Sequence, residues 1–85
     1  MPVILKTKGF NIDFLKLSPE ERKQTLKALR FLVYNPRHPS LQTHKIEGTM
    51  FMEAYVNMDI RIIFERTSDT IVLLAVGHHD ILKNL

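Results

Sequence analysis

The stretch that decides the fold is MEAYVNMDIRIIF, residues 52–64. Apolar and other side chains alternate on both sides of Asn57-Met58-Asp59. An alternation with a period of two is typical of strands that bury one face. Asn and Asp are turn-forming residues, and they stand at the two ends of the short connection. We therefore predict a β-hairpin with its turn at residues 57–59.

The apolar pattern also predicts the register of this hairpin. The register that joins apolar residues across the two strands pairs Val56 with Ile60, Ala54 with Ile62, and Met52 with Phe64. A slip of one residue would turn half of these side chains to the opposite face. The same register places Tyr55 beside Arg61 and Glu53 beside Ile63, all on the face away from the helices.

Three further runs predict strands around the hairpin. Residues 71–76 are apolar on both sides, which is typical of an inner strand, and the run stops at Gly77-His78-His79-Asp80. Residues 41–46 form a predicted strand that Gly48 ends. Val3-Ile4-Leu5 predicts a short N-terminal strand.

Two helices are expected between the first strand and the rest of the sheet. Residues 11–17 predict about two turns of helix after Gly9. The second helix is better specified, because Ser18-Pro19 supplies an N-cap hydroxyl and a proline at the first position, followed by a glutamate for a capping box. Asn35-Pro36 ends it. Its apolar stripe consists of Leu26, Leu29, Leu32 and Val33.

These elements predict one α+β domain over residues 1–85. A short N-terminal strand and two helices pack on one face of a curved antiparallel sheet. The chain has 45% hydrophobic residues and no cysteine, so neither a disulfide nor a cysteine-ligated metal is expected. Its four histidines lack metal-binding spacing, and we expect no metal or other cofactor.

Charge and hydropathy bear on location and partners. The net charge of +3 suits a polyanionic partner, either nucleic acid or an acidic protein. No signal peptide is visible, and no apolar run approaches the roughly 20 residues that a membrane span needs. We therefore expect a cytoplasmic protein that does not bind membranes.

Five short sequence segments, taken in their order along the chain, resemble the RelE/ParE toxin superfamily, and more narrowly its branch of cytotoxic translational repressors. The segments are Asn35-Pro36-Arg37-His38-Pro39-Ser40-Leu41, Lys45-Ile46-Glu47-Gly48, Glu53-Ala54-Tyr55-Val56-Asn57, Ile60-Arg61-Ile62-Ile63-Phe64 and Val76-Gly77-His78-His79-Asp80. The resemblance covers nearly all of the chain from Phe10 to Asp80.

The resemblance implies the toxin of a type II toxin–antitoxin system, neutralised by an acidic antitoxin. RelE-like members enter the ribosome and cut mRNA without metal, whereas ParE-like members poison DNA gyrase. We expect the mRNA endonuclease. The first helix, of about two turns, is short for a ParE-like protein. A degenerate toxin that only binds its antitoxin stays open as well, because residues 51–57 lack the lysines of known nucleases and no aromatic residue follows His79.

Metal-free RNA cleavage needs proton transfer and positive charge near the crowded phosphorus. Arg61 matches the family's arginine in this strand and is expected on the exposed side of the sheet, to stabilise the phosphorane. His79 matches a histidine or arginine position of the family, and we expect it to act as acid or base. Asp80 would orient His79 or cap a C-terminal turn. The ordinary alternatives are a contact of Arg61 with Tyr55, Glu53 or Glu65, and a solvated His79.

Supporting roles fall to residues on neighbouring positions. Glu53 could serve as a base and Tyr55 could stack on an unpaired nucleobase, or both could be ordinary sheet surface. Lys45 is preferred over His44 as a phosphate contact. The second helix carries a basic stripe that is either a solvated face or a contact for ribosomal RNA or antitoxin. The stripe consists of Arg22, Lys23, Lys27 and Arg30.

Overall fold

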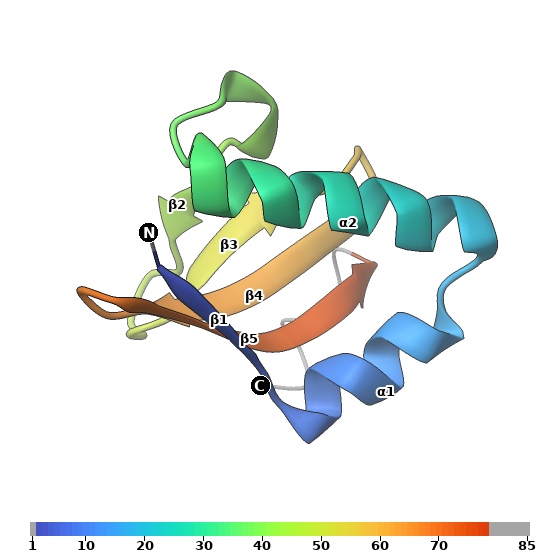
Figure 1. Ribbon diagram of the computed structural model, residues 1–85, viewed down its shortest axis with the longest axis horizontal. Coiled ribbons are helices and arrows are strands. Elements are labelled where there is room, and N and C mark those ends of the chain that lie inside the picture. The colour runs from blue at the N-terminus through green and yellow to red at the C-terminus, as the bar shows by residue number, and fades with distance from the viewer. Residues whose placement is uncertain (1, 79–85) are drawn as a thin grey trace.

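Two helices cover one face of a five-stranded sheet in the computed structural model, which describes residues 2–78 (Figure 1). The helices are α1 (Lys8–Lys16) and α2 (Pro19–Tyr34). The strands are β1 (Val3–Lys6), β2 (His44–Lys45), β3 (Met52–Tyr55), β4 (Ile60–Arg66) and β5 (Thr70–His78), and a 3-10 helix η1 spans Pro39–Leu41. Their order in the sheet is β1-β5-β4-β3-β2. The predicted α+β architecture is confirmed.

The β3–β4 hairpin has the register that the alternation predicts. Met52 pairs with Phe64, Ala54 with Ile62, and Tyr55 with Arg61. The Val56 N–H donates to the Ile60 carbonyl at 2.9 Å, which completes the apolar ladder.

The sheet is mixed rather than wholly antiparallel. Strand β1 runs parallel to β5, with Val3 beside Thr70 and Lys6 beside Leu73. A parallel pair needs a long crossover connection, and the two helices together with β2, β3 and β4 supply it. The antiparallel prediction holds for the other three strand pairs.

Helix α1 starts earlier than the pattern after Gly9 predicts. Thr7 is its N-cap, because its hydroxyl accepts a hydrogen bond from the Phe10 N–H at 3.2 Å. The same hydroxyl donates to the Leu73 carbonyl at 2.8 Å. One side chain therefore starts the helix and ties it to β5.

The predicted strand at residues 41–46 is reduced to His44–Lys45. Leu41 belongs to η1, and Gln42 has a left-handed backbone with φ 43°. A left-handed residue cannot continue a strand, so β2 begins only after it. Strand β5, in contrast, continues to His78, two residues past the expected end at Val76.

The core lies between the helices and the sheet. Helix α2 buries Thr25, Ala28, Leu29 and Leu32, whereas Leu26 of the predicted stripe is 43% exposed. On the sheet, the irregular pairing at Ile63/Phe64 leaves Leu74 without a Cα partner on β4. Such a bulge resets the alternation of side chains. It lets Ile71, Leu73 and Val76 all face the core, where each is at most 2% exposed.

The start of α2 has the predicted capping box. The Glu21 N–H donates to the Ser18 hydroxyl at 3.1 Å, and the Ser18 N–H donates to the Glu21 carboxylate at 2.8 Å. The Ser18 N–H is the main cause that lowers the pKa of Glu21 below 4.5, with smaller lowering by the Ser18 hydroxyl and His78. A lowered folded-state pKa means that the carboxylate stabilises the fold above the unfolded-state pKa, and that this contribution is lost as the pH falls through the folded-state pKa.

We predict that Ser18→Ala lowers the free energy of unfolding by about 1 kcal/mol at pH 7, because an orphan N–H of the first turn loses its acceptor. Glu21→Gln should have a lower free energy of unfolding than the parent protein near neutral pH. This difference should shrink below pH 4.5, where the parent's carboxylate becomes protonated. Denaturant unfolding monitored by circular dichroism measures both. Ser68→Ala in the exposed β4–β5 turn is the control; equal unfolding midpoints for the two alanine variants would contradict the prediction.

Candidate functional site

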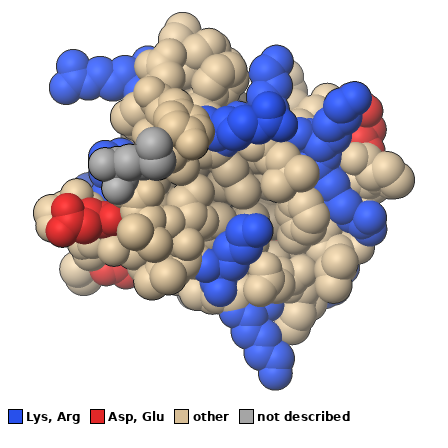
Figure 2. Space-filling model, viewed as in Figure 1, with Lys and Arg blue, Asp and Glu red and all other residues tan. Residues whose placement is uncertain are grey.

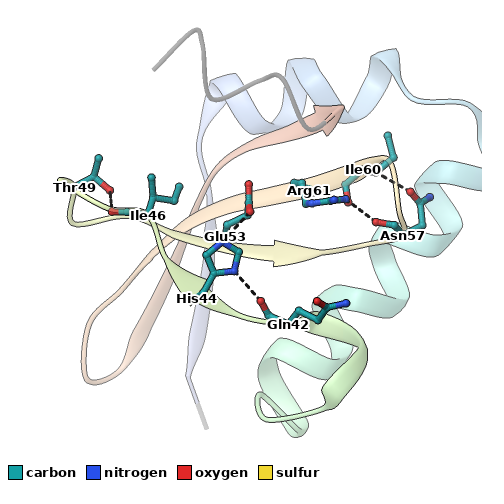
Figure 3. Close-up of polar contacts among 8 residues, drawn as sticks. All are labelled: Gln42, His44, Ile46, Thr49, Glu53, Asn57, Ile60 and Arg61. Atoms are coloured by element: carbon teal, nitrogen blue, oxygen red, sulfur yellow. Dashed lines mark hydrogen bonds and ion pairs between the residues drawn. The ribbon is translucent and has the colours of Figure 1, made fainter.

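Four side chains gather on the sheet face that points away from the helices. We call them the sheet-face cluster: His44 from β2, Glu53 and Tyr55 from β3, and Arg61 from β4. Two cross-strand pairs bring them together, His44 opposite Glu53 and Tyr55 opposite Arg61. Because partners in register point to the same face, the cluster follows from the hairpin register. Figure 3 shows His44, Glu53 and Arg61 with their polar partners.

Arg61 is held rigidly in this cluster. Its guanidinium carbon lies 3.5 Å from the centre of the Tyr55 ring, a close cation–π contact. Its Nη1 donates to the Asn57 carbonyl at 2.7 Å and to the Ile60 carbonyl at 3.2 Å. These acceptors are neutral, so they orient the guanidinium without cancelling its charge.

The prediction of an exposed Arg61 is wrong, since the residue is only 8% exposed. The contact with Tyr55 that the sequence left as the ordinary alternative is present. The physical reason is that two carbonyl oxygens, of Asn57 in the turn and of Ile60 at the start of β4, accept hydrogen bonds from the guanidinium and hold it against the sheet. An ion pair of Arg61 with Glu53 or Glu65 does not occur in the part of the chain that the structure describes.

Asn57 fixes the turn that holds Arg61. Its Oδ1 accepts hydrogen bonds from the N–H groups of Asp59 and Ile60, both at 2.8 Å. Its Nδ2 donates to the Gln24 side chain on α2 at 2.7 Å. The turn is thus closed from within and tied to the helix above it. The sequence marked Asn57 as a turn residue but did not indicate its link to Gln24.

His44 and Glu53 form a close polar pair across β2 and β3. His44 Nδ1 lies 2.9 Å from the Gln42 carbonyl, and its Nε2 lies 3.0 Å from Glu53 Oε1. A carbonyl only accepts hydrogen bonds, so Nδ1 carries a hydrogen. Glu53 is 7% exposed and the His44 side chain 51%, so the histidine links a buried carboxyl to solvent.

The structure brings together only some of the predicted site residues. Glu53, Tyr55 and Arg61 share one face, as predicted. Lys45 pairs with Met52, whose side chain packs against the core, so Lys45 belongs to the opposite face. His44, which the sequence analysis ranked below Lys45 as a phosphate contact, belongs to the cluster. His79 and Asp80 lie outside the described residues.

Two further features of residues 2–78 bear on chemistry and location. No three histidine, aspartate or glutamate side chains in this range come together as a metal-binding group. Neither α1 nor α2 has the length and hydrophobicity that would let it cross a bilayer.

The mixed sheet with two helices on one face is the fold that this chain shares with structures of RelE-type toxins. Solved structures share this fold. YafQ in the Escherichia coli DinJ–YafQ toxin–antitoxin complex is 18% identical with a TM-score of 0.77, over 95% of this chain and 96% of that one. RelE in the archaeal RelE–RelB complex from Pyrococcus horikoshii is 19% identical with a TM-score of 0.76, over 93% and 96%.

A metal-bound toxin from Helicobacter pylori is 22% identical with a TM-score of 0.77, over 96% of this chain and 99% of that one. No protein-family model matches the sequence, and a search of curated proteins finds no match. The resemblance to RelE-like proteins is therefore confirmed at the level of the fold, along nearly the whole chain.

We predict that Asn57→Ala lowers the free energy of unfolding by about 2 kcal/mol, because two turn N–H groups and the Gln24 amide lose their partner. Gln24→Ala, which removes only the last of these bonds, should cost about 1 kcal/mol or less. Met58→Ala in the same turn is the control, since Met58 is 79% exposed. Denaturant unfolding compares the three variants, and an Asn57→Ala midpoint equal to that of Met58→Ala would refute the role of Asn57.

Proposed function

We propose that this protein is the toxin of a type II toxin–antitoxin system and cuts messenger RNA at the ribosome without a metal ion. The observation that carries the proposal is the sheet-face cluster, where a fixed guanidinium lies on the same face as the His44–Glu53 pair, whose Nε2 and Oε1 are 3.0 Å apart. The RelE-type fold supports it. A cytoplasmic location belongs to the same proposal.

In this proposal the cluster supplies the base and the positive charge that RNA transesterification requires, and the acid comes from a residue outside the cluster. The 2′-oxygen attacks phosphorus and loses its proton to a base, the bond from phosphorus to the 5′-oxygen breaks, and the 5′-oxygen gains a proton. The products are a 2′,3′-cyclic phosphate and a 5′-hydroxyl. We assign the base to Glu53 assisted by His44, and stabilisation of the phosphorane to Arg61. His79, which matches the family position, is the candidate acid, with Asp80 to orient it.

Tyr55 combines two roles in this proposal. One face of the Tyr55 ring holds the Arg61 guanidinium by the cation–π contact. Only the other face can then stack on a nucleobase, as aromatic side chains do in single-stranded RNA recognition. The pair therefore links base binding to the position of the phosphate-stabilising charge.

An acidic antitoxin is the second partner that we propose. YafQ and the archaeal RelE are each found with an antitoxin, DinJ and RelB respectively. In this chain an apolar cavity of about 330 Å³ lies between β1 and α2, with Leu26 43% and Tyr34 70% exposed beside it. Lys6 and Arg30 also line it. Apolar surface with cations suits an amphipathic acidic segment.

We predict that the purified protein, added to a translating extract, cuts mRNA and leaves 5′-hydroxyl ends, as mapped by primer extension and end labelling. Arg61→Ala should slow cutting by about 100-fold or more, because one preorganised charge at a phosphoryl transition state contributes that much. Arg61→Lys should restore little of the cutting rate that Arg61→Ala loses, since an ammonium lacks the planar fork of the guanidinium. Lys8→Ala on α1 is the control, and unfolding curves check that each variant is folded.

We also predict that Glu53→Gln and His79→Ala each slow cutting by roughly 10²–10⁴-fold, the range for loss of a general acid or base. Lys45→Ala is the control: Lys45 lies on the face of β2 opposite the cluster, so this substitution should change the cutting rate little. Intact message together with blocked translation would refute the nuclease. Inhibition of DNA supercoiling would favour the gyrase poison, and unaffected growth on expression would favour a degenerate toxin that only binds its antitoxin.

A further inference from the structure

A second candidate site lies on the helix-covered side of the sheet, where the α2–β2 connection passes over β3 and β4. It is a groove of about 710 Å³, which we call the arginine groove. Apolar side chains of Leu32, Met52 and Phe64 line it, and Arg37 and Arg66 contribute exposed guanidinium groups. A cavity of this size holds a ligand as large as one nucleotide.

A smaller groove of about 310 Å³ adjoins the arginine groove, because His38 lines both. We call it the lysine groove, after Lys27. Tyr55 of the sheet-face cluster also lines it. Tyr55 is the one cluster residue that lines either groove, and His38 joins that groove to the one with Arg37 and Arg66.

The charges along these grooves are all positive. Arg37 and Arg66 line one and Lys27 the other, and no carboxylate is among the described residues that line either. Two other hollows of the described chain contain carboxylates, since Glu20 lies with Lys23 and Arg30, and Asp13 with Lys16. The cavity between β1 and α2 carries only cations, Lys6 and Arg30, as the two grooves do. Figure 2 shows Lys and Arg side chains spread over the helix-covered face. Because no carboxylate of the described residues lines the two grooves, their cations favour an anionic ligand.

A fixed aromatic pair stands where the grooves meet. The His38 ring stacks on Phe31 with 3.9 Å between ring centres and 11° between the planes. Its Nδ1 accepts from the Ser40 N–H at 3.1 Å, so the neutral ring carries its hydrogen on Nε2. Flat aromatic surface between cationic side chains is what single-stranded nucleic acid binds, with bases on rings and phosphates on cations.

We infer that the arginine and lysine grooves together bind single-stranded RNA. Arg37, Arg66 and Lys27 contact successive phosphates, and a base lies on the apolar floor of the arginine groove. The occupant is RNA rather than an acidic protein segment because paired cations, stacked rings and a nucleotide-sized apolar floor occur together. The inference rests on the proposed function in taking this RNA to continue from the strand bound at the sheet-face cluster.

The test measures binding of a fluorescein-labelled ten-residue oligouridine by fluorescence anisotropy, with 2′-O-methyl groups so that it cannot be cut. Arg37→Gln/Arg66→Gln should weaken binding by about tenfold and reduce the slope of log K against log salt by about 1.4, which corresponds to two single-strand phosphate contacts. Lys8→Gln/Lys16→Gln on α1 changes the charge equally at two exposed positions outside both grooves and should alter the affinity less than twofold. Lys27→Gln alone should reduce the slope by about 0.7.

The outcomes separate this inference from the proposed function. If the parent protein binds the oligonucleotide and the double arginine variant binds it weakly, the grooves bind RNA, even where the translating extract shows no cutting. If message is cut but the double arginine variant binds RNA as well as the parent, the inference alone is overturned. Failure of the parent to bind at low salt also overturns it. So does a double variant that keeps its RNA affinity and loses affinity for a fluorescein-labelled polyglutamate peptide, which would assign the grooves to an acidic protein.

Discussion

The register between β3 and β4 is the constraint on which both the core and the candidate site depend. One face of this ladder supplies Ala54, Ile62 and Phe64 to the core. The other face carries Glu53, Tyr55 and Arg61. A slip by one residue would bury the guanidinium under the helices and expose the apolar side chains, at a cost far above the marginal stability of a small domain. Hydrophobic burial thus positions the polar chemistry, although the two lie on opposite sides of the sheet.

Much of this fold could be predicted because local patterns and global packing agree. The alternation in residues 52–64 predicts the hairpin, and the Ser18 capping box predicts the start of α2. The parallel pairing of β1 could not be predicted, since a strand of four residues carries no signal for its partner's direction. The late start of β2 within the predicted strand at residues 41–46 could not be predicted either, because Gln42 is a residue type that usually avoids the left-handed conformation it adopts here.

The candidate site was predictable in part for the same reason. The pairing of Tyr55 with Arg61 follows from the register. The burial of Arg61 depends instead on turn carbonyls, whose direction the sequence does not encode in any pattern. Likewise, Lys45 rather than His44 was expected to contact phosphate, because β2 has only two residues and too little alternation to reveal that His44 faces the cluster.

Burial of the Arg61 charge has a cost that the surrounding contacts must offset. Two carbonyl acceptors and the Tyr55 ring compensate for lost hydration, and charge-assisted bonds of this kind are stronger than neutral ones. The result is a cation whose orientation is set before any ligand arrives, which is how a site avoids reorganisation during a reaction. The same turn is tied through Asn57 to Gln24 on α2, and Tyr55 and Gln24 both line the lysine groove. A ligand in that groove would therefore contact the residues that hold the guanidinium in place, so binding on the helix side and charge placement on the sheet side are physically connected.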